Sequence, residues 1–317
     1  MLSAVATLSP PSAFGIPSYD YVRHYPDLAP LRQALLAGYW AGIEAYFDKL
    51  PAYQEPTIAT AMVARTRGVE KFLQVAGGGP GTSVLAGTLL GTRLVVKAWN
   101  ARGLARARQT SKSRFRSFHQ LLRQAEQVLS DVTAADPGNI AAWTARLRTA
   151  RGLQMGIAEA TRRYEQAAKA RPHPLDAQLS HLQQLCPKWG GSPEHMHRFA
   201  RQCAESSPPG SLNAVAVAEA HLERAYHVGS FSYLRQRHVR ESVLNAVARS
   251  VDHPEFRPVH GWVQAECSFS RVLWLAGERR AAAERLRVLG NRVTTYPWDS
   301  RLQLKAIQLI SRPYQKA

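Results

Sequence analysis

One spacing of small and large residues occurs twice in the chain, thirty-five residues apart. A small residue is followed by a large one, then by a second small position, and finally by a proline. The first copy is Ala125, Leu129, Val132 and Pro137, and the second is Ala160, Tyr164, Ala167 and Pro172. Small residues let two helices lie close together, the large residue fills the gap, and proline ends the helix. The spacing predicts stacked helical hairpins, with the small and large residues packed between helices.

These two copies resemble the second helix of the tetratricopeptide repeat, a helical hairpin of similar period, although Val132 stands where that family usually has alanine. Trp143 and Leu147 lie between the copies, where the family has an aromatic residue and a leucine in its first helix. The match covers about residues 118–172. The resemblance implies an all-α fold of stacked antiparallel helical hairpins, a TPR-like α-solenoid.

A degenerate hairpin is predicted over residues 262–297, where Gly277 joins two helices and Pro297 ends the second. The chain is also similar to uncharacterised bacterial helical-repeat proteins. The stretches that carry this likeness are Trp99-Asn100-Ala101-Arg102-Gly103 and Lys188-Trp189-Gly190-Gly191-Ser192. No activity follows from that resemblance.

The rest of the chain has apolar residues at helical spacing and breaks rich in glycine and proline. We expect more than half of the residues in α-helix and essentially no sheet. Ser192 and Pro193 form one helix start, since serine caps free N–H groups and proline suits the first helical position. The predicted organisation is a loose leader over residues 1–26 and one helical-repeat domain over residues 27–317.

Several features favour a cytoplasmic protein without a membrane segment. Residues 1–19 contain no Lys or Arg and no long apolar core, unlike a secretory signal. The most apolar stretch, Val84–Trp99, contains Arg93 and Lys97 and is shorter than the ~20 residues that cross a bilayer. The three cysteines are too few for a disulfide framework.

Positive charge is concentrated in one segment. The net charge is +18, and no acidic residue occurs between Glu70 and Glu126. The basic segment, residues 93–123, contains these anion-binding candidates: Arg102, Arg106, Arg108, Lys112, Arg114 and Arg116. A basic segment of this kind is typical of proteins that bind polyanions, including nucleic acids.

The spacing within the basic segment strengthens this prediction. On one helix, Arg108, Lys112 and Arg116 share a face, and their repulsion disfavours the helix unless an anion neutralises them. If Thr110 or Ser111 caps that helix, bases occupy its first turns, where the helix dipole favours acids. The alternative is a solvated face, or pairing of these arginines with acids from other helices.

The candidate chemical motifs do not fit their templates. Cys186, His195, His197 and Cys203 contain four metal-ligand types, but histidines two residues apart point to different sides of a helix, so no metal site is predicted. The glycine-rich stretch Ala76–Ser83 lacks the lysine of a phosphate-binding loop, and Thr82 or Ser83 is read as a helix cap.

No catalytic or cofactor motif was found, and the chain is predicted to be a non-catalytic protein without a cofactor. The favoured function is a helical-repeat scaffold that binds a protein or peptide partner through a groove. The alternative is association with nucleic acid or another polyanion through the basic segment. An enzyme on a helical scaffold stays open, because fold does not exclude function.

Overall fold

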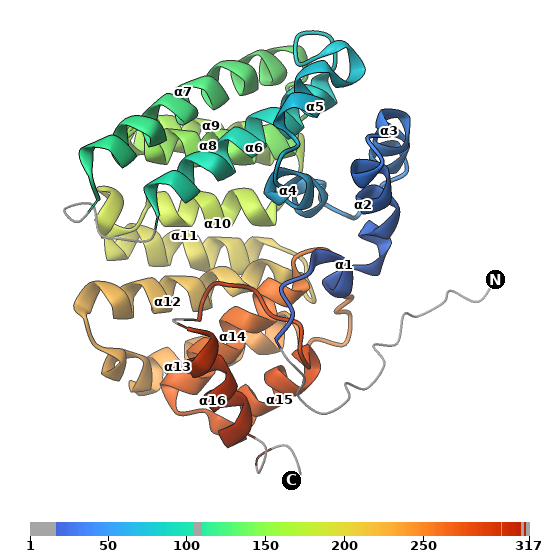
Figure 1. The fold of residues 1–317 in the computed structure, drawn as a ribbon. Helices are drawn as coiled ribbons and strands as arrows, with labels where there is room; N and C mark the ends of the chain where they lie inside the picture. Colours follow the sequence, from blue (N-terminus) through green and yellow to red (C-terminus); the bar gives the residue numbers. More distant parts are fainter. Residues whose placement is uncertain (1–16, 104–109, 299, 312–313, 315–317) are drawn as a thin grey trace. The chain divides into compact units, whose positions relative to one another are not determined.

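The computed structural model describes residues 17–103, 110–298, 300–311 and 314 (Figure 1). Helices make up 73% of the described residues. The described residues contain no β-strand, only an isolated bridge between Ser18 and Arg292. The all-α class expected from the apolar periodicity is therefore confirmed.

The α-helices of the described residues are α1 Tyr21–His24, α2 Ala29–Leu36, α3 Trp40–Asp48, α4 Thr57–Arg65, α5 Glu70–Val75, α6 Val84–Arg102, α7 Lys112–Ala135, α8 Ile140–Gly152, α9 Gly156–Ala170, α10 Leu175–Gln184, α11 Pro193–Ser206, α12 Val215–Val228, α13 Arg237–Arg249, α14 Trp262–Ala276, α15 Arg279–Leu289 and α16 Arg301–Ser311.

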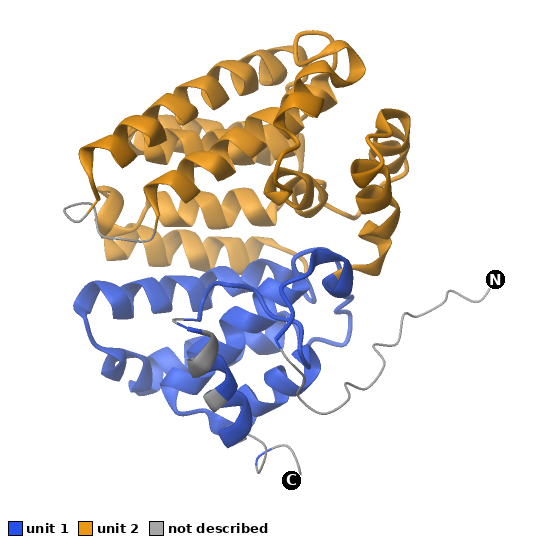
Figure 2. Ribbon diagram, viewed as in Figure 1, with its two compact units in different colours: residues 1–24, 209–317 blue, residues 25–208 orange. Residues whose placement is uncertain are grey.

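The chain divides into two compact units (Figure 2). Unit 2 is residues 25–208, and unit 1 combines residues 1–24 with residues 209–317. The sequence suggested one continuous domain over residues 27–317. The division falls at Pro208-Pro209-Gly210, where two prolines and a glycine with φ of +77° separate α11 from α12. Such residues end a helix, so the backbone has a natural boundary there.

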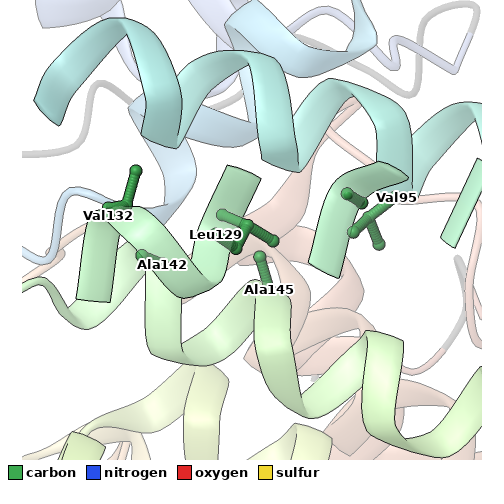
Figure 3. Packing of buried hydrophobic residues seen from close by; sticks show 6 residues of the cluster. Val95, Leu129, Val132, Ala142 and Ala145 are labelled. Carbon is green, nitrogen blue, oxygen red and sulfur yellow. The ribbon is translucent and has the colours of Figure 1, made fainter. Parts of the chain in front are cut away.

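The core of unit 2 joins α6, α7 and α8 through the side chains labelled in Figure 3, namely Val95, Leu129, Val132, Ala142 and Ala145. Close approach of α6 to α7 depends on two glycines of α6. A Cβ atom at Gly87 would lie 2.6 Å from Val132, and one at Gly91 would lie 2.5 Å from Leu129. The absence of these methyl groups lets the α7 side chains pack against the α6 backbone.

The residues of the repeated spacing lie on the inner faces of α7 and α9. Ala125, Leu129, Val132, Ala160 and Ala167 are buried, whereas Tyr164 is half-buried. Each proline follows the end of its helix: Pro137 comes after α7 and Pro172 after α9. The arrangement of these helices as tetratricopeptide-type hairpins stays a prediction.

We expect Tyr164→Ala to lower the free energy of unfolding by about 2–3 kcal/mol. The Tyr164 ring stacks on the His181 ring, with centroids 5.0 Å apart, and meets Phe199 edge to face at 5.1 Å. Its removal leaves a gap between α9, α10 and α11. Urea unfolding measures the loss, and Tyr53→Ala is the control, because the Tyr53 side chain is 68% exposed. Equal stability of the two variants would contradict packing by Tyr164.

Unit 1 contains the predicted hairpin of residues 262–297. Helices α14 and α15 pack against each other and are joined through Gly277, which has φ of +89°. Helix α15 ends at Leu289, so Pro297 does not end it, in contrast to the sequence expectation. Gly290 is the residue at the end of this helix.

The N-terminal part of unit 1 differs from the expected loose leader. Residues 1–16 lie outside the described residues. Ser18 donates from its N–H to the carbonyl of Asn291 at 2.7 Å and accepts from the N–H of Val293 at 3.0 Å. His24 is buried and bonds to the Ser18 carbonyl through Nε2 at 2.8 Å. The leader is therefore fixed from Ser18 onward.

Candidate anion-binding surface

The start of α7 places two cations on one exposed face. Ser111 precedes the helix in an extended conformation, and its Oγ accepts a hydrogen bond from the N–H of Arg114 at 3.4 Å. Ser111 is one of the two residues, with Thr110, that were expected from the sequence to cap this helix. Lys112 and Arg116 follow, one turn apart and both exposed. The first turn contains no acid, so the positive end of the helix dipole adds to their charge.

Two of the three residues expected on one basic face, Lys112 and Arg116, lie in α7, which begins at Lys112 after its cap Ser111. Arg106 and Arg108 lie outside the described residues, so the place of Arg108 on that face stays a prediction.

In the N-terminal part of the basic segment, two cations share one carboxylate within the protein. The Arg93 guanidinium lies 3.0 Å and the Lys97 ammonium 2.9 Å from one oxygen of Glu70. Although burial raises the pKa of Glu70, hydrogen bonds from Lys97 and Arg93 lower it to about 2. These two cations therefore belong to a structural ion cluster that links α5 to α6.

The cations of α7 are not neutralised in this way. In the part of the chain that the structure describes, Lys112, Arg114 and Arg116 have no carboxylate within salt-bridge distance. Arg114 is partly engaged, because its Nε donates to the Ala101 carbonyl at 2.9 Å. That bond places a cation at the C-terminal end of α6, where the dipole favours it, and ties the start of α7 to that end.

A cluster of tryptophan and arginine side chains lies at the same end of α6. Trp99 of α6 and Trp189 of the short 3-10 helix η4 (Pro187–Trp189) meet edge to face, with centroids 6.0 Å apart. The Arg151 guanidinium lies over both rings, 5.2 Å from Trp99 and 5.8 Å from Trp189. The Arg102 guanidinium lies 5.8 Å from the Trp99 centroid. We call these four residues the Trp–Arg cluster.

The Trp–Arg cluster is supported from within unit 2. The Trp99 ring packs edge to face on Phe118, with centroids 4.9 Å apart. A Cβ atom at Gly152 would lie 2.3 Å from Leu122 and 2.8 Å from Phe118, so this glycine allows α8 to approach the same aromatic group. The rings of Trp99 and Trp189 stay half-buried. Trp99 is thus held by the core of unit 2, and both tryptophan residues are partly exposed to solvent.

Sequence reasoning found only part of this site. Arg102 was a candidate, but Arg151 and Trp189 were not, since neither lies in the acid-free stretch. Residues 99–103 and 188–192 drew attention separately, and the structure brings them together. Both contain a tryptophan before a helix-ending glycine, four residues before Gly103 in one stretch and directly before Gly190 in the other.

The two cysteines considered for a metal site, Cys186 and Cys203, are buried thiols. The Sγ of Cys186 lies 3.5 Å from the Met196 sulfur. Burial raises the pKa of the Cys203 thiol to about 12. Across the described residues, no group of three or more His, Cys, Asp or Glu side chains is placed to hold a metal ion.

The glycine-rich stretch Ala76–Ser83 ends in a helix cap, because Ser83 Oγ accepts from the N–H of Ala86 at 3.2 Å at the start of α6. Within the described ranges, none of the helices is long and apolar enough for a membrane span.

Comparison with known proteins adds no relative: no protein-family model, curated protein or solved structure matches this chain.

Proposed function

We propose that the protein binds a polyanion through a basic surface formed by Arg102, Lys112, Arg114 and Arg116. The observation that carries this proposal is the exposure of Lys112 and Arg116 on one face of α7 without an acidic partner among the described residues. Two like charges one turn apart weaken a helix by a few tenths of a kcal/mol, and a bound anion removes that cost.

The placement of these cations further supports an anionic ligand. Lys112, Arg114 and Arg116 lie in the first turns of a 24-residue helix, and both the clustered cations and the positive end of the helix dipole favour a negative group. The alternative of pairing with acids applies to Arg93 and Lys97 but not to Lys112, Arg114 or Arg116. The peptide-binding scaffold that the sequence favoured stays a prediction. We prefer the polyanion because its proposed site has identified side chains.

Charge reversal of two residues tests this proposal. We expect Lys112→Glu with Arg116→Glu to elute from heparin at a much lower salt concentration than the wild type, with an unchanged circular dichroism spectrum. The reason is that sequence-independent binding of polyanions depends on clustered cations and is screened by salt. Elution in a salt gradient is the measurement.

The matched control is Arg280→Glu with Arg287→Glu. These two arginines are exposed on α15, outside the basic segment. Each reversal removes two charges, so both double variants change the net charge from +18 to 18 − 4 = +14. The control should keep most of its retention. Equal retention of the two variants would show that net charge alone acts, and the proposed surface would be rejected in favour of the scaffold.

A further inference from the structure

We propose that the polyanion is a single-stranded nucleic acid and that one of its bases stacks on the Trp–Arg cluster. This inference rests on the polyanion-binding function proposed above and adds the class of polymer. The aromatic rings of the Trp–Arg cluster would select a nucleic acid, whereas the basic surface alone would accept any polymer of negative charge.

The Trp–Arg cluster offers planar groups that suit a base. The planes of the Trp99 and Trp189 rings are inclined by 82°, and both rings are half-buried. Guanidinium groups lie over them at 5.2–5.8 Å. A nucleobase has a flat π face that stacks on indole or on guanidinium. Sulfated sugars and acidic polypeptides without aromatic residues lack such a face, so they would gain nothing from these rings.

The phosphate-binding and base-binding groups meet at the end of α6. Arg102 is the last residue of α6. Its guanidinium lies over the ring of Trp99, the residue one helical turn earlier in the chain. Arg114 from α7 bonds to the neighbouring carbonyl of Ala101. Cations that suit phosphates therefore adjoin rings that suit bases, which is the combination that single-strand-binding proteins use.

The single-stranded form follows from the same geometry. In a duplex, the faces of the bases are covered by their neighbours in the stack, so a side chain reaches them only after costly unstacking. A loop or single strand exposes these faces. The Trp–Arg cluster therefore discriminates against duplexes, while the cations of α7 do not.

Of the other tryptophans, Trp40 is half-buried against the Phe72 ring, and Trp143, Trp262 and Trp298 are buried. Trp274 is half-buried, with the Arg279 guanidinium 3.9 Å from its centroid, and so resembles the proposed site locally. It lies on α14, and Glu278 is the sequence neighbour of its arginine. Trp274 is thus a matched control for loss of an indole next to an arginine.

The test uses the full chain and fluorescence anisotropy with four probes at one salt concentration: oligodeoxythymidylate, oligouridylate, a duplex of equal length, and heparin as a competitor. We expect the wild type to bind at least one of the single strands about tenfold more tightly than the duplex. Trp189→Leu should weaken that binding about tenfold, the effect of losing one stacked base. Trp189→Phe should keep most of it, Trp274→Leu should keep all of it, and heparin binding should be the same in all.

A second measurement does not depend on variants. An oligouridylate or oligodeoxythymidylate carrying a photoreactive iodopyrimidine should crosslink to wild-type peptides that contain Trp99 or Trp189. A crosslink confined to other peptides would overturn the assignment, as would full single-strand affinity in folded Trp189→Leu.

The two proposals fail in different ways. If the wild type binds heparin but does not prefer a single strand to the duplex, the basic surface stands and the base site is wrong. If the wild type binds neither heparin nor any oligonucleotide, both proposals are wrong. A preference for the thymidylate or the uridylate would report the sugar or the 5-methyl group of the base, and either result supports the base site.

Discussion

Replacing Glu126 by alanine is expected to lower the free energy of unfolding by about 3 kcal/mol or more. Glu126 of α7 is the acid shared by two buried arginines. Its Oε1 lies 2.8 Å from a guanidinium nitrogen of Arg146 and 2.8 Å from one of Arg163, and its Oε2 accepts from the Thr149 hydroxyl. The side chains of Arg146 and Arg163 are only 10% and 3% exposed. Removal of the carboxylate would leave two buried guanidinium groups with Glu159 as the remaining acid beside them.

The two arginines would not be affected equally. Arg163 would keep its ion pair with Glu159 at 2.6 Å. Among the described residues, Arg146 would keep neutral partners alone, the Thr133 hydroxyl at 2.6 Å and the Trp143 ring at 5.1 Å. Most of the lost free energy should therefore come from Arg146, because a buried charge without a counter-charge is strongly unfavourable.

This network also predicts a pH dependence. Although burial raises the pKa of Glu126, hydrogen bonds and charge from Arg163, with Thr149 and Arg146, hold it below the ordinary value of 4.5. A carboxyl whose pKa is lower in the folded state stabilises that state above the unfolded pKa. This contribution is lost as the pH falls below about 4.5 towards the folded pKa. Glu126→Ala should consequently show less loss of stability in that acidic range than the wild type.

Urea unfolding at neutral and acidic pH measures both effects. Glu165→Ala is the control, because Glu165 is exposed on α9 and has no ion pair among the described residues. Its effect should stay within about 0.5 kcal/mol. If Glu126→Ala were as stable as the control, the network would contribute nothing to the packing of α7, α8 and α9.

The second large effect is expected for Gly191→Ala, which should cost at least about 3 kcal/mol or prevent folding. An alanine Cβ at this position would lie 1.9 Å from the Leu185 carbonyl oxygen and 2.3 Å from its carbon. Both are backbone atoms, so no side-chain rotation relieves the clash. The turn from α10 through η4 to α11 would have to move, and with it Trp189.

Gly190→Ala is a matched control in the same turn. Gly190 has φ of +92°, but a Cβ there would meet nothing within 4 Å. Its substitution should cost about 1–2 kcal/mol, the strain of a left-handed conformation for an L-residue. Thermal unfolding of both variants makes the comparison. A smaller loss for Gly191→Ala than for Gly190→Ala would contradict the close approach to Leu185.

Local features of the fold were predictable because their causes lie within a few residues. Ser192 caps α11 through a hydrogen bond from the N–H of His195 at 3.2 Å, and Pro193 is its first residue, as the sequence indicated. Ser111 caps α7, and Pro172 follows the end of α9. Capping and helix termination depend on nearby backbone groups, so one sequence is enough to place them.

Contacts between distant helices were not predictable. Glu126 meets Arg146 and Arg163, which lie 20 and 37 residues further along the chain. Nothing in helical periodicity distinguishes these buried arginines from those on solvated faces. The close approach of Gly191 to the carbonyl of Leu185 likewise depends on how the turn folds back on α10, which local sequence does not show.

The candidate site divides in the same way. The cations of α7 stood out in the sequence because they lie in one acid-free stretch. Pairing of Arg93 and Lys97 with Glu70 was not visible there, because it requires α5 and α6 to pack together. Trp99 and Trp189 are ninety residues apart in the sequence, and only the packing of unit 2 brings their rings to 6.0 Å.

Polyanion binding at the start of α7 is tested most directly by the salt dependence of affinity for a single-stranded oligonucleotide. The slope of log affinity against log salt counts neutralised phosphates, at ~0.7 per contact for single strands. We predict that Lys112→Glu with Arg116→Glu reduces this slope by about 1.4, the value for two lost contacts. Arg280→Glu with Arg287→Glu should leave it unchanged. Equal slopes for the wild type and both double variants would contradict the assignment of the binding surface to α7.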